Sequence, residues 1–301
     1  RQLGKTTNGL TCATVDEAEA LVAVGVGSVL IANEIVTRGK VERLASLAEK
    51  AQIIAVVDAL EPLRLFSSVA SERNVVMDVL IDVDTGLGRC GVKSPQEAVT
   101  LAREVADAPG VRFAGIMGYE GRLRATMPDR ARYATYAFER LAEVKNALES
   151  AGLAVGIVSS SGTSTLREAL QSPCVTEVQA GTYAFMEPDI LDLGLPFRCA
   201  LSVMTTVIST SPGQIVVDAG RRVIGCCYGP PLPISSEAEV LRVTDDHTML
   251  RWNGALPPLG SRQPLRPSSN RTTFRLNREA WLVGEDGMAE HVSALPAAPP
   301  P

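Results

Sequence analysis

The sequence has 301 residues, 46% of them hydrophobic and 21% charged, and a formal net charge of −5. This length and composition suit a globular protein with one large domain, or with a large and a small one. Its 29 basic residues form no block, which argues against partners such as nucleic acid or an anionic membrane surface. No apolar run approaches the roughly 18 residues of a membrane span. The six cysteines lack a Cys-x-x-Cys spacing, a pattern typical of reduced thiols in a cytoplasmic protein.

Short apolar runs alternate with amphipathic helical patterns over the first two thirds of the chain. The predicted strands are 11–14, 28–32, 53–57, 75–83, 111–117, 155–158 and 175–179, and the predicted helices are 15–25, 39–51, 61–72, 95–107, 129–151 and 163–170. Strands separated by helices of this length predict right-handed βαβ units and a parallel sheet. Seven such units predict an α/β fold, a (β/α)₈ barrel whose first strand we expect upstream of residue 1.

The pattern changes near Pro196. From Cys199 onward, β-branched runs are separated by Gly/Pro turns and helical spacing is absent, which predicts strands at 202–209, 214–217, 239–244, 248–252, 273–276 and 280–283. Such runs are typical of an antiparallel β-domain. We therefore expect a barrel over residues 1–195, a β-domain over 196–295 and a disordered Pro/Ala-rich tail over 296–301.

The fourth predicted strand runs into a glycine-rich turn over residues 82–91, DVDTGLGRCG, with Arg89 at its tip. Glycines let the backbone approach a ligand closely, and a guanidinium group suits an anionic oxygen. The alternative is a βα loop whose arginine caps a neighbouring carboxylate.

Polar residues follow the later strands as well, at the barrel end where chemistry collects. Tyr119 follows the fifth strand and Gln179 the seventh, while 161–163 (Ser-Gly-Thr) opens a helix. Free N–H groups and small hydroxyls at such a point suit a phosphate, with 181–183 (Gly-Thr-Tyr) closing its other side. The alternatives are a polar N-cap loop and, for Tyr119, a half-buried barrel tyrosine.

The arginine turn and the order of barrel and β-domain resemble the alanine-racemase-like pyridoxal phosphate (PLP) enzymes, most closely their D-threonine aldolase and D-serine dehydratase branch. The resemblance covers residues 1 to about 295. It implies that Arg89 lies near the phenolic oxygen of PLP, that the ring of Tyr119 packs against the cofactor, and that Gln179 lies near the pyridine nitrogen. It also assigns the phosphate to Ser161, Gly162, Thr163, Gly181, Thr182 and Tyr183.

Two positions depart from that branch. The lysine that binds PLP covalently is expected upstream of Arg1, because none of the five lysines here fits. The branch also binds a divalent metal through a His-x-Asp or His-x-Cys pair, and the matching residues here are Ser269 and Arg271. Serine is a poor ligand and arginine is a permanent cation, so we expect no metal there. Arg271 is a candidate for holding a substrate carboxylate instead.

The resemblance implies a PLP-dependent lyase that cleaves Cα–Cβ of D-β-hydroxy-amino acids or dehydrates them. One alternative is a metal-independent amino-acid racemase on the same scaffold. Another is a non-catalytic protein that binds PLP or an amino acid, which the missing lysine and metal pair favour. The expected partners are a small amino-acid substrate and, as is frequent in the family, a second copy of the chain in a homodimer.

Overall fold

The computed structural model describes residues 7–121, 123–277 and 279–293. They fall into two compact units: unit 1 comprises residues up to 123 and 127–180, and unit 2 comprises 124–126 and the chain from Gly181 onward. No helix among the described residues has the length and apolarity needed to cross a membrane.

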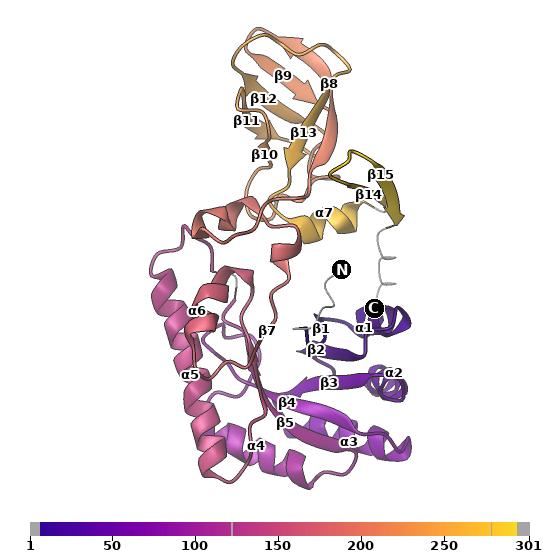
Figure 1. Cartoon of the computed structure of the whole chain (residues 1–301), viewed down its shortest axis with the longest axis vertical. Coiled ribbons are helices and arrows are strands. Elements are labelled where there is room, and N and C mark those ends of the chain that lie inside the picture. The colour runs from indigo at the N-terminus through magenta and orange to yellow at the C-terminus, as the bar shows by residue number, and fades with distance from the viewer. Residues whose placement is uncertain (1–6, 122, 278, 294–301) are drawn as a thin grey trace. The chain divides into compact units, whose positions relative to one another are not determined.

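Unit 1 is a curved parallel sheet with helices along its outer side (Figure 1). Its seven strands lie in chain order: β1 (Leu10–Cys12), β2 (Ser28–Glu34), β3 (Gln52–Val57), β4 (Met77–Asp82), β5 (Val111–Gly118), β6 (Ile157–Ser160) and β7 (Glu177–Val178). The helices between them are α1 (Val15–Ala23), α2 (Arg38–Ala48), α3 (Leu60–Glu72), α4 (Pro95–Asp107), α5 (Arg130–Ser150) and, after the 3₁₀ turn η1 (Thr163–Thr165), α6 (Leu166–Gln171). The predicted βαβ series of the alanine-racemase-like fold is confirmed.

Side-chain caps begin two of these helices. Thr14 forms a capping box with Glu17 before α1, and the Ser94 hydroxyl caps α4, which has proline at its first position. Each cap satisfies backbone N–H groups that lack a partner inside the helix.

The central strands β3 and β4 are buried on both faces of the sheet. On β3, Ile53, Ala55 and Val57 pack into the large core beneath the helices. Ile54 and Val56 alternate with them and join a smaller cluster with Leu30, Leu80 and Met117 on the inner face. Strands covered on both faces read as continuous apolar runs, which is why the sequence predicted them.

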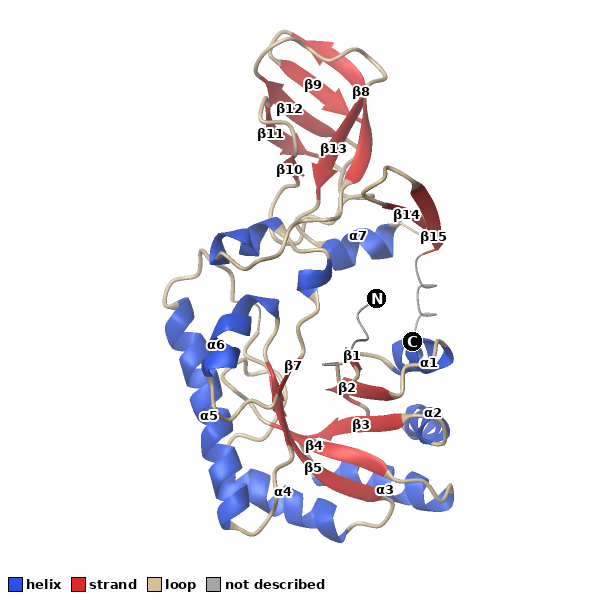
Figure 2. Ribbon diagram, in the orientation of Figure 1, coloured by secondary structure: helices blue, strands red, loops and turns tan. Residues whose placement is uncertain are grey.

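Unit 2 is mainly an antiparallel sheet of six strands in the order β10-β13-β8-β9-β12-β11 (Figure 2). These strands are β8 (Val203–Ser211), β9 (Gln214–Val217), β10 (Leu232–Pro233), β11 (Ala238–Val243), β12 (Thr248–Trp252) and β13 (Arg262–Arg266). The two end strands, β10 and β11, contact each other, so the sheet is nearly closed around a core that includes Val217, Leu250 and Leu265.

The rest of unit 2 consists of short elements. They are the 3₁₀ turns η2 (Thr182–Ala184) and η3 (Pro188–Leu193), the helix α7 (Asn270–Leu276) and a hairpin of β14 (Glu279–Val283) and β15 (Ala289–Ser293). The strand predicted at 273–276 is wrong, because these residues belong to α7. The Ser269 side chain accepts the N–H of Thr272 and starts this helix, and a cap of this kind outweighs the β-branched residues that follow it.

Candidate active site

The arginine turn after β4 is built around one carboxylate. Asp84 Oδ1 accepts the N–H groups of Gly86 and Gly88 at 3.0 and 2.9 Å, and Asp84 Oδ2 accepts Lys93 Nζ at 2.7 Å. Gly86 and Gly88 have φ of 107° and 69°, angles that favour glycine. Lysine 93 therefore neutralises this carboxylate, and the exposed Arg89 has no described carboxylate within ion-pair distance.

Arg89 instead lies next to the residue that follows β5. Its Cζ is 6.0 Å from the centroid of the Tyr119 ring, within the range of a cation–π contact. Tyr119 is half-buried. A Cβ atom built on Gly162 would lie 3.5 Å from Cε2 of the same ring. The structure thus brings Arg89, Tyr119 and Gly162 together from three successive strand ends.

The loop after β6 carries an unusual backbone angle. Ser161 has φ of 73°, a left-handed conformation that a non-glycine residue adopts at a cost and that collects at functional sites. Its hydroxyl donates to Gly162 O at 2.9 Å and lies 3.1 Å from Thr165 Oγ1. Ser161 and Thr163 are both buried, so this polar loop is held inside unit 1.

Glu120, which the sequence did not single out, lies against this loop. Its Oε1 accepts the Gly162 N–H at 3.3 Å and the Thr165 hydroxyl, and its Oε2 lies 3.5 Å from the Ser160 hydroxyl. The residue is 7% exposed, and burial raises the pKa of its carboxyl group above the ordinary value. The predicted phosphate loop therefore already holds an acidic side chain.

Gln179 is fixed at the end of β7. Its Nε2 donates to Ser159 Oγ at 2.9 Å, and its backbone N–H lies 3.2 and 3.1 Å from the carbonyl oxygens of Ser160 and Ser161. These contacts place Gln179 beside the loop after β6, on the same sheet edge as Tyr119 and Arg89.

Acidic groups gather at the ends of β2, β3 and β4. Oxygens of Glu34 and Asp58 and the Cys90 sulfur lie within 4.8 Å of one another, a set whose atom types can hold a cation. Asp58 Oδ2 also accepts the Gly91 N–H at 3.0 Å, so the cluster ties the arginine turn to β3. Burial and the Glu34 carboxyl group raise the pKa of Cys90 to about 11, which keeps its thiol protonated.

Asp82 lies beside this cluster and is 5% exposed. Burial raises the pKa of Asp82 to about 8, with a further contribution from the carboxyl groups of Glu34 and Asp58 and an opposing one from Arg89. Carboxyl groups this close cannot all ionise cheaply, so Asp82 holds its proton to a higher pH than an ordinary aspartate does. Neither Glu34 nor Asp82 was predicted as part of the site. The only signal in the sequence was an acidic residue at or just after the end of each apolar strand.

The remaining predicted phosphate ligands belong to unit 2. Thr182 and Tyr183 form the turn η2 after Gly181, and the Tyr183 ring packs on Phe197 with centroids 5.3 Å apart. That these residues close the phosphate site stays a prediction.

The positions matched to the metal ligands of the branch have structural partners within unit 2. Ser269 is buried, accepts the Thr272 N–H as the cap of α7 and donates to Thr272 Oγ1 at 3.0 Å. Arg271 is exposed, and its Nη2 donates to the Tyr228 hydroxyl at 2.8 Å. A hydroxyl occupied by a helix cap has little left to offer a metal ion.

Of the described lysines, only Lys93 belongs to the turns and loops discussed above. Lys40 is on α2 and Lys50 follows it, while Lys93 and Lys145 pair with Asp84 and Glu149. Lys5 and the expected lysine upstream of Arg1 lie outside the described residues.

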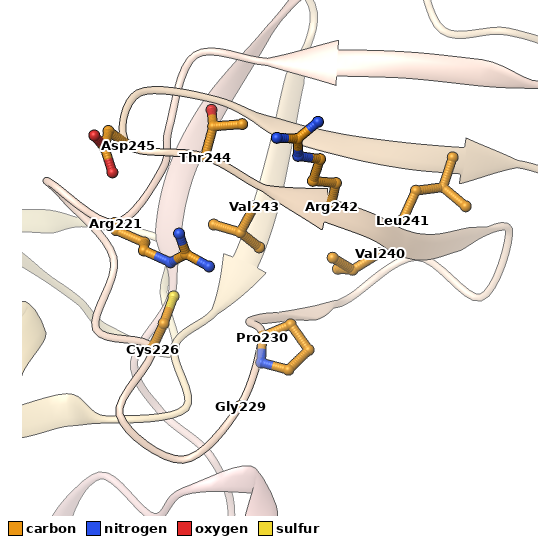
Figure 3. Close-up of a pocket in the computed structure, with 10 residues that line it drawn as sticks. All are labelled: Arg221, Cys226, Gly229, Pro230, Val240, Leu241, Arg242, Val243, Thr244 and Asp245. Carbon is orange, nitrogen blue, oxygen red and sulfur yellow. The ribbon is translucent and has the colours of Figure 1, made fainter.

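A pocket of about 750 Å³ lies within unit 2. Figure 3 shows Arg221, Cys226 and Val243 facing one another across it, while Arg242 points away. Burial raises the pKa of the Cys226 thiol despite the neighbouring Arg221, so this cysteine is not an activated nucleophile. The lining comprises Arg221, Cys226, Gly229, Pro230, Val240, Leu241, Arg242, Val243, Thr244 and Asp245.

Comparisons with known proteins match both parts of the chain. A family model described as "Alanine racemase, N-terminal domain" matches residues 1–188, and one described as "Putative serine dehydratase domain" matches residues 200–283. A D-threonine aldolase of Arthrobacter sp is 33% identical over 99% of this chain and 81% of its own length. A 3-hydroxy-D-aspartate aldolase of Paracoccus denitrificans (strain Pd 1222) is 30% identical over 94% of this chain and 77% of its own.

A solved structure agrees with these matches. The crystal structure of D-threonine aldolase from Filomicrobium marinum superposes with a TM-score of 0.90 and 34% identity, covering 96% of this chain and 82% of that one. The match extends over both the parallel sheet and the antiparallel domain. This chain therefore belongs to the alanine racemase N-terminal domain family, in the group that pairs this domain with a serine-dehydratase-type domain and includes D-threonine aldolase.

Proposed function

We propose that this chain is a PLP-dependent lyase of D-β-hydroxy-amino acids. The observation that carries the proposal is the meeting of Arg89, Tyr119 and Gly162 at one edge of the parallel sheet. Similarity to two aldolases, whose names give D-threonine and 3-hydroxy-D-aspartate, supports the substrate class. Cleavage of Cα–Cβ would give glycine and an aldehyde. The match to a serine dehydratase domain favours dehydration as the second outcome.

The residues at this edge suit PLP. The exposed guanidinium group of Arg89 would hold the phenolic oxygen, and the Tyr119 ring would pack against the pyridine. Any side chain at position 162 would fill the space beside that ring, so glycine keeps the approach open. Ser161, Gly162 and Thr163, with Gly181, Thr182 and Tyr183, would hold the phosphate. PLP supplies an electron sink for the electrons freed at Cα.

Gln179 would face the pyridine nitrogen. Its amide is held by Ser159, and an amide carries no charge that would keep this nitrogen protonated. The cofactor would then withdraw electrons less strongly than it does beside an acidic partner. A Gln179→Glu variant with an unchanged cofactor spectrum and rate would contradict this role.

We also propose that the reaction proceeds without a metal at the Ser269 and Arg271 positions. Their hydrogen bonds to Thr272 and Tyr228 support this proposal. A racemase reaction and non-catalytic binding of PLP or an amino acid are the competing functions. We further propose that the protein is cytoplasmic and forms a homodimer. Sedimentation of the purified chain would test the dimer.

The deciding experiment is a product assay. The chain is incubated with PLP and D-threonine, with L-threonine as the stereochemical control. Acetaldehyde and glycine from the D-isomer alone would support cleavage, whereas 2-oxobutanoate and ammonia would indicate dehydration. Formation of L-allothreonine, by inversion at Cα alone, would favour the racemase, and retention of PLP with no product would favour the binding protein.

A further inference from the structure

Glu120 occupies the groups that a phosphate would use in the loop after β6. Its carboxyl group accepts the N–H of Gly162 at 3.3 Å and the hydroxyl of Thr165. The Gly162 N–H belongs to the stretch 161–163, to which the phosphate is assigned in the proposed function, and Thr165 lies two residues further along the same loop. The loop is thus held by an internal acid of the same hydrogen-bonding type as the expected ligand.

An ionised Glu120 and a phosphate dianion would oppose each other here. Glu120 is 7% exposed, so water screens the two charges poorly and their repulsion is much stronger than at a surface. Burial already favours the neutral form, since it raises the pKa of the Glu120 carboxyl group. A neutral carboxyl group can remain beside a phosphate and donate a hydrogen bond to it.

None of the described groups around Glu120 cancels this conflict. From β6 and its loop, Ser160 and Thr165 present uncharged hydroxyls. On neighbouring elements, Arg89 lies over the ring of Tyr119, itself titratable, and Asp82 is paired with Glu34. The ion pair of Arg130 on α5 with Glu168 on α6 is internally neutral, and Arg130 also donates to the carbonyl oxygen of Ser164.

We propose that Glu120 competes with the phosphate group of the cofactor for the loop 161–165, so that the phosphate binds only while the Glu120 carboxyl group is uncharged. This inference rests on the proposed PLP function. It makes Glu120 a positioning residue whose protonation is linked to cofactor binding. At any pH at which Glu120 is ionised in the unliganded protein, binding of the phosphate takes up one proton.

The test compares pyridoxamine phosphate with pyridoxamine, which lacks the phosphate. Neither ligand needs a lysine. Both ligands have the same ring and amine, so the effect of pH on these groups cancels in the ratio of the two affinities. The phosphate stays close to dianionic between pH 7 and 9, because its second pKa is about 6. In the unmodified chain this ratio should fall as the pH rises above the pKa of the Glu120 carboxyl group, with a limiting slope of about tenfold per pH unit. In Glu120→Gln it should stay flat and be higher at pH 9.

Glu104→Gln makes the same change at an exposed position on α4 and should behave like the unmodified chain. The pH profile of the unmodified chain needs no substitution, so the test stands even where Glu120→Gln does not fold. A flat ratio in the unmodified chain, with pyridoxamine phosphate bound, overturns the role of Glu120 alone. Absence of pyridoxamine phosphate binding by every variant at every pH overturns the cofactor site and this inference together.

Discussion

The guanidinium carbon of Arg89 lies 6.0 Å from the centre of the Tyr119 ring, and this contact joins the turn after β4 to the end of β5. It fixes an exposed cation above an aromatic face. Lys93 neutralises Asp84 in the same turn, and Arg89 has no described carboxylate within ion-pair distance.

Replacing Arg89 tests this arrangement. Arg89→Lys keeps the charge but loses the planar fork that stacks on Tyr119 and holds an oxygen from two donors. We expect pyridoxamine phosphate to bind about tenfold more weakly, a loss of about 1.4 kcal/mol. Arg89→Met, which removes the charge as well, should weaken binding further. Arg103→Lys, on the exposed side of α4, is the matched control, and equal affinity in all three variants would exclude Arg89 from the site.

Asp82 should make the stability of the chain depend on pH. Its pKa is raised to about 8 in the folded state, whereas an unfolded aspartate titrates near 3.9. The stabilisation is present in full below pH 4 and is lost progressively until the pH has risen through about 8, because over this range the unfolded aspartate is ionised while Asp82 in the folded state still holds its proton. Asp82→Asn should therefore melt at a higher temperature than the unmodified chain at pH 9, with a smaller difference at pH 6. Thermal denaturation at both values checks this, and a gap that is larger at pH 6 would refute it.

A divalent metal should leave the reaction unchanged. Ser269 Oγ is engaged by Thr272, and Arg271 is a permanent cation paired with the Tyr228 hydroxyl. We expect the rate of D-threonine cleavage to be the same with Mn²⁺, with Zn²⁺ and after treatment with EDTA. Stimulation by either ion would show that another set of ligands is used, and the Glu34, Asp58 and Cys90 cluster would be the first to substitute.

Gly115 should tolerate no side chain. Its φ is 149°, and an added Cβ would lie 1.9 Å from the carbonyl oxygen of Ile157 on the neighbouring strand β6. Gly115→Ala should lower the free energy of unfolding by on the order of 3 kcal/mol, since strand backbones would have to move apart. Gly25→Ala is the control: it has φ of 89° but open space around its Cβ position, so it should cost about 1–2 kcal/mol of backbone strain alone. Chemical denaturation of both variants gives the comparison, and equal losses would contradict the clash.

Much of the fold could be predicted because its determinants are local. The apolar runs at 53–57 and 75–83 indicated strands buried on both faces, and the structure has β3 and β4 there with Ile53 and Ile54 packed on opposite sides. The helix predicted at 95–107 is α4, and the Ser94 hydroxyl caps its first turn. Residues 273–276 were an exception: Thr273 and Phe274 are typical of strands, yet these residues lie in α7, whose first turn is capped by the Ser269 side chain.

The sequence by itself determined the order of strands and helices in the parallel sheet, the arginine turn and the candidate residues Arg89, Tyr119, Gly162 and Gln179, because glycine spacing and apolar periodicity act over a few neighbouring residues. Only the tertiary structure decided what surrounds them. Glu120 accepts a hydrogen bond from Thr165, which is 45 residues away in the sequence. Asp82 at the end of β4 lies close to Glu34 at the end of β2, with β3 between the two strands. Burial and pairing of charges depend on which strand ends become neighbours, so the protons on these acids are a property of the folded sheet and cannot be read from residue order.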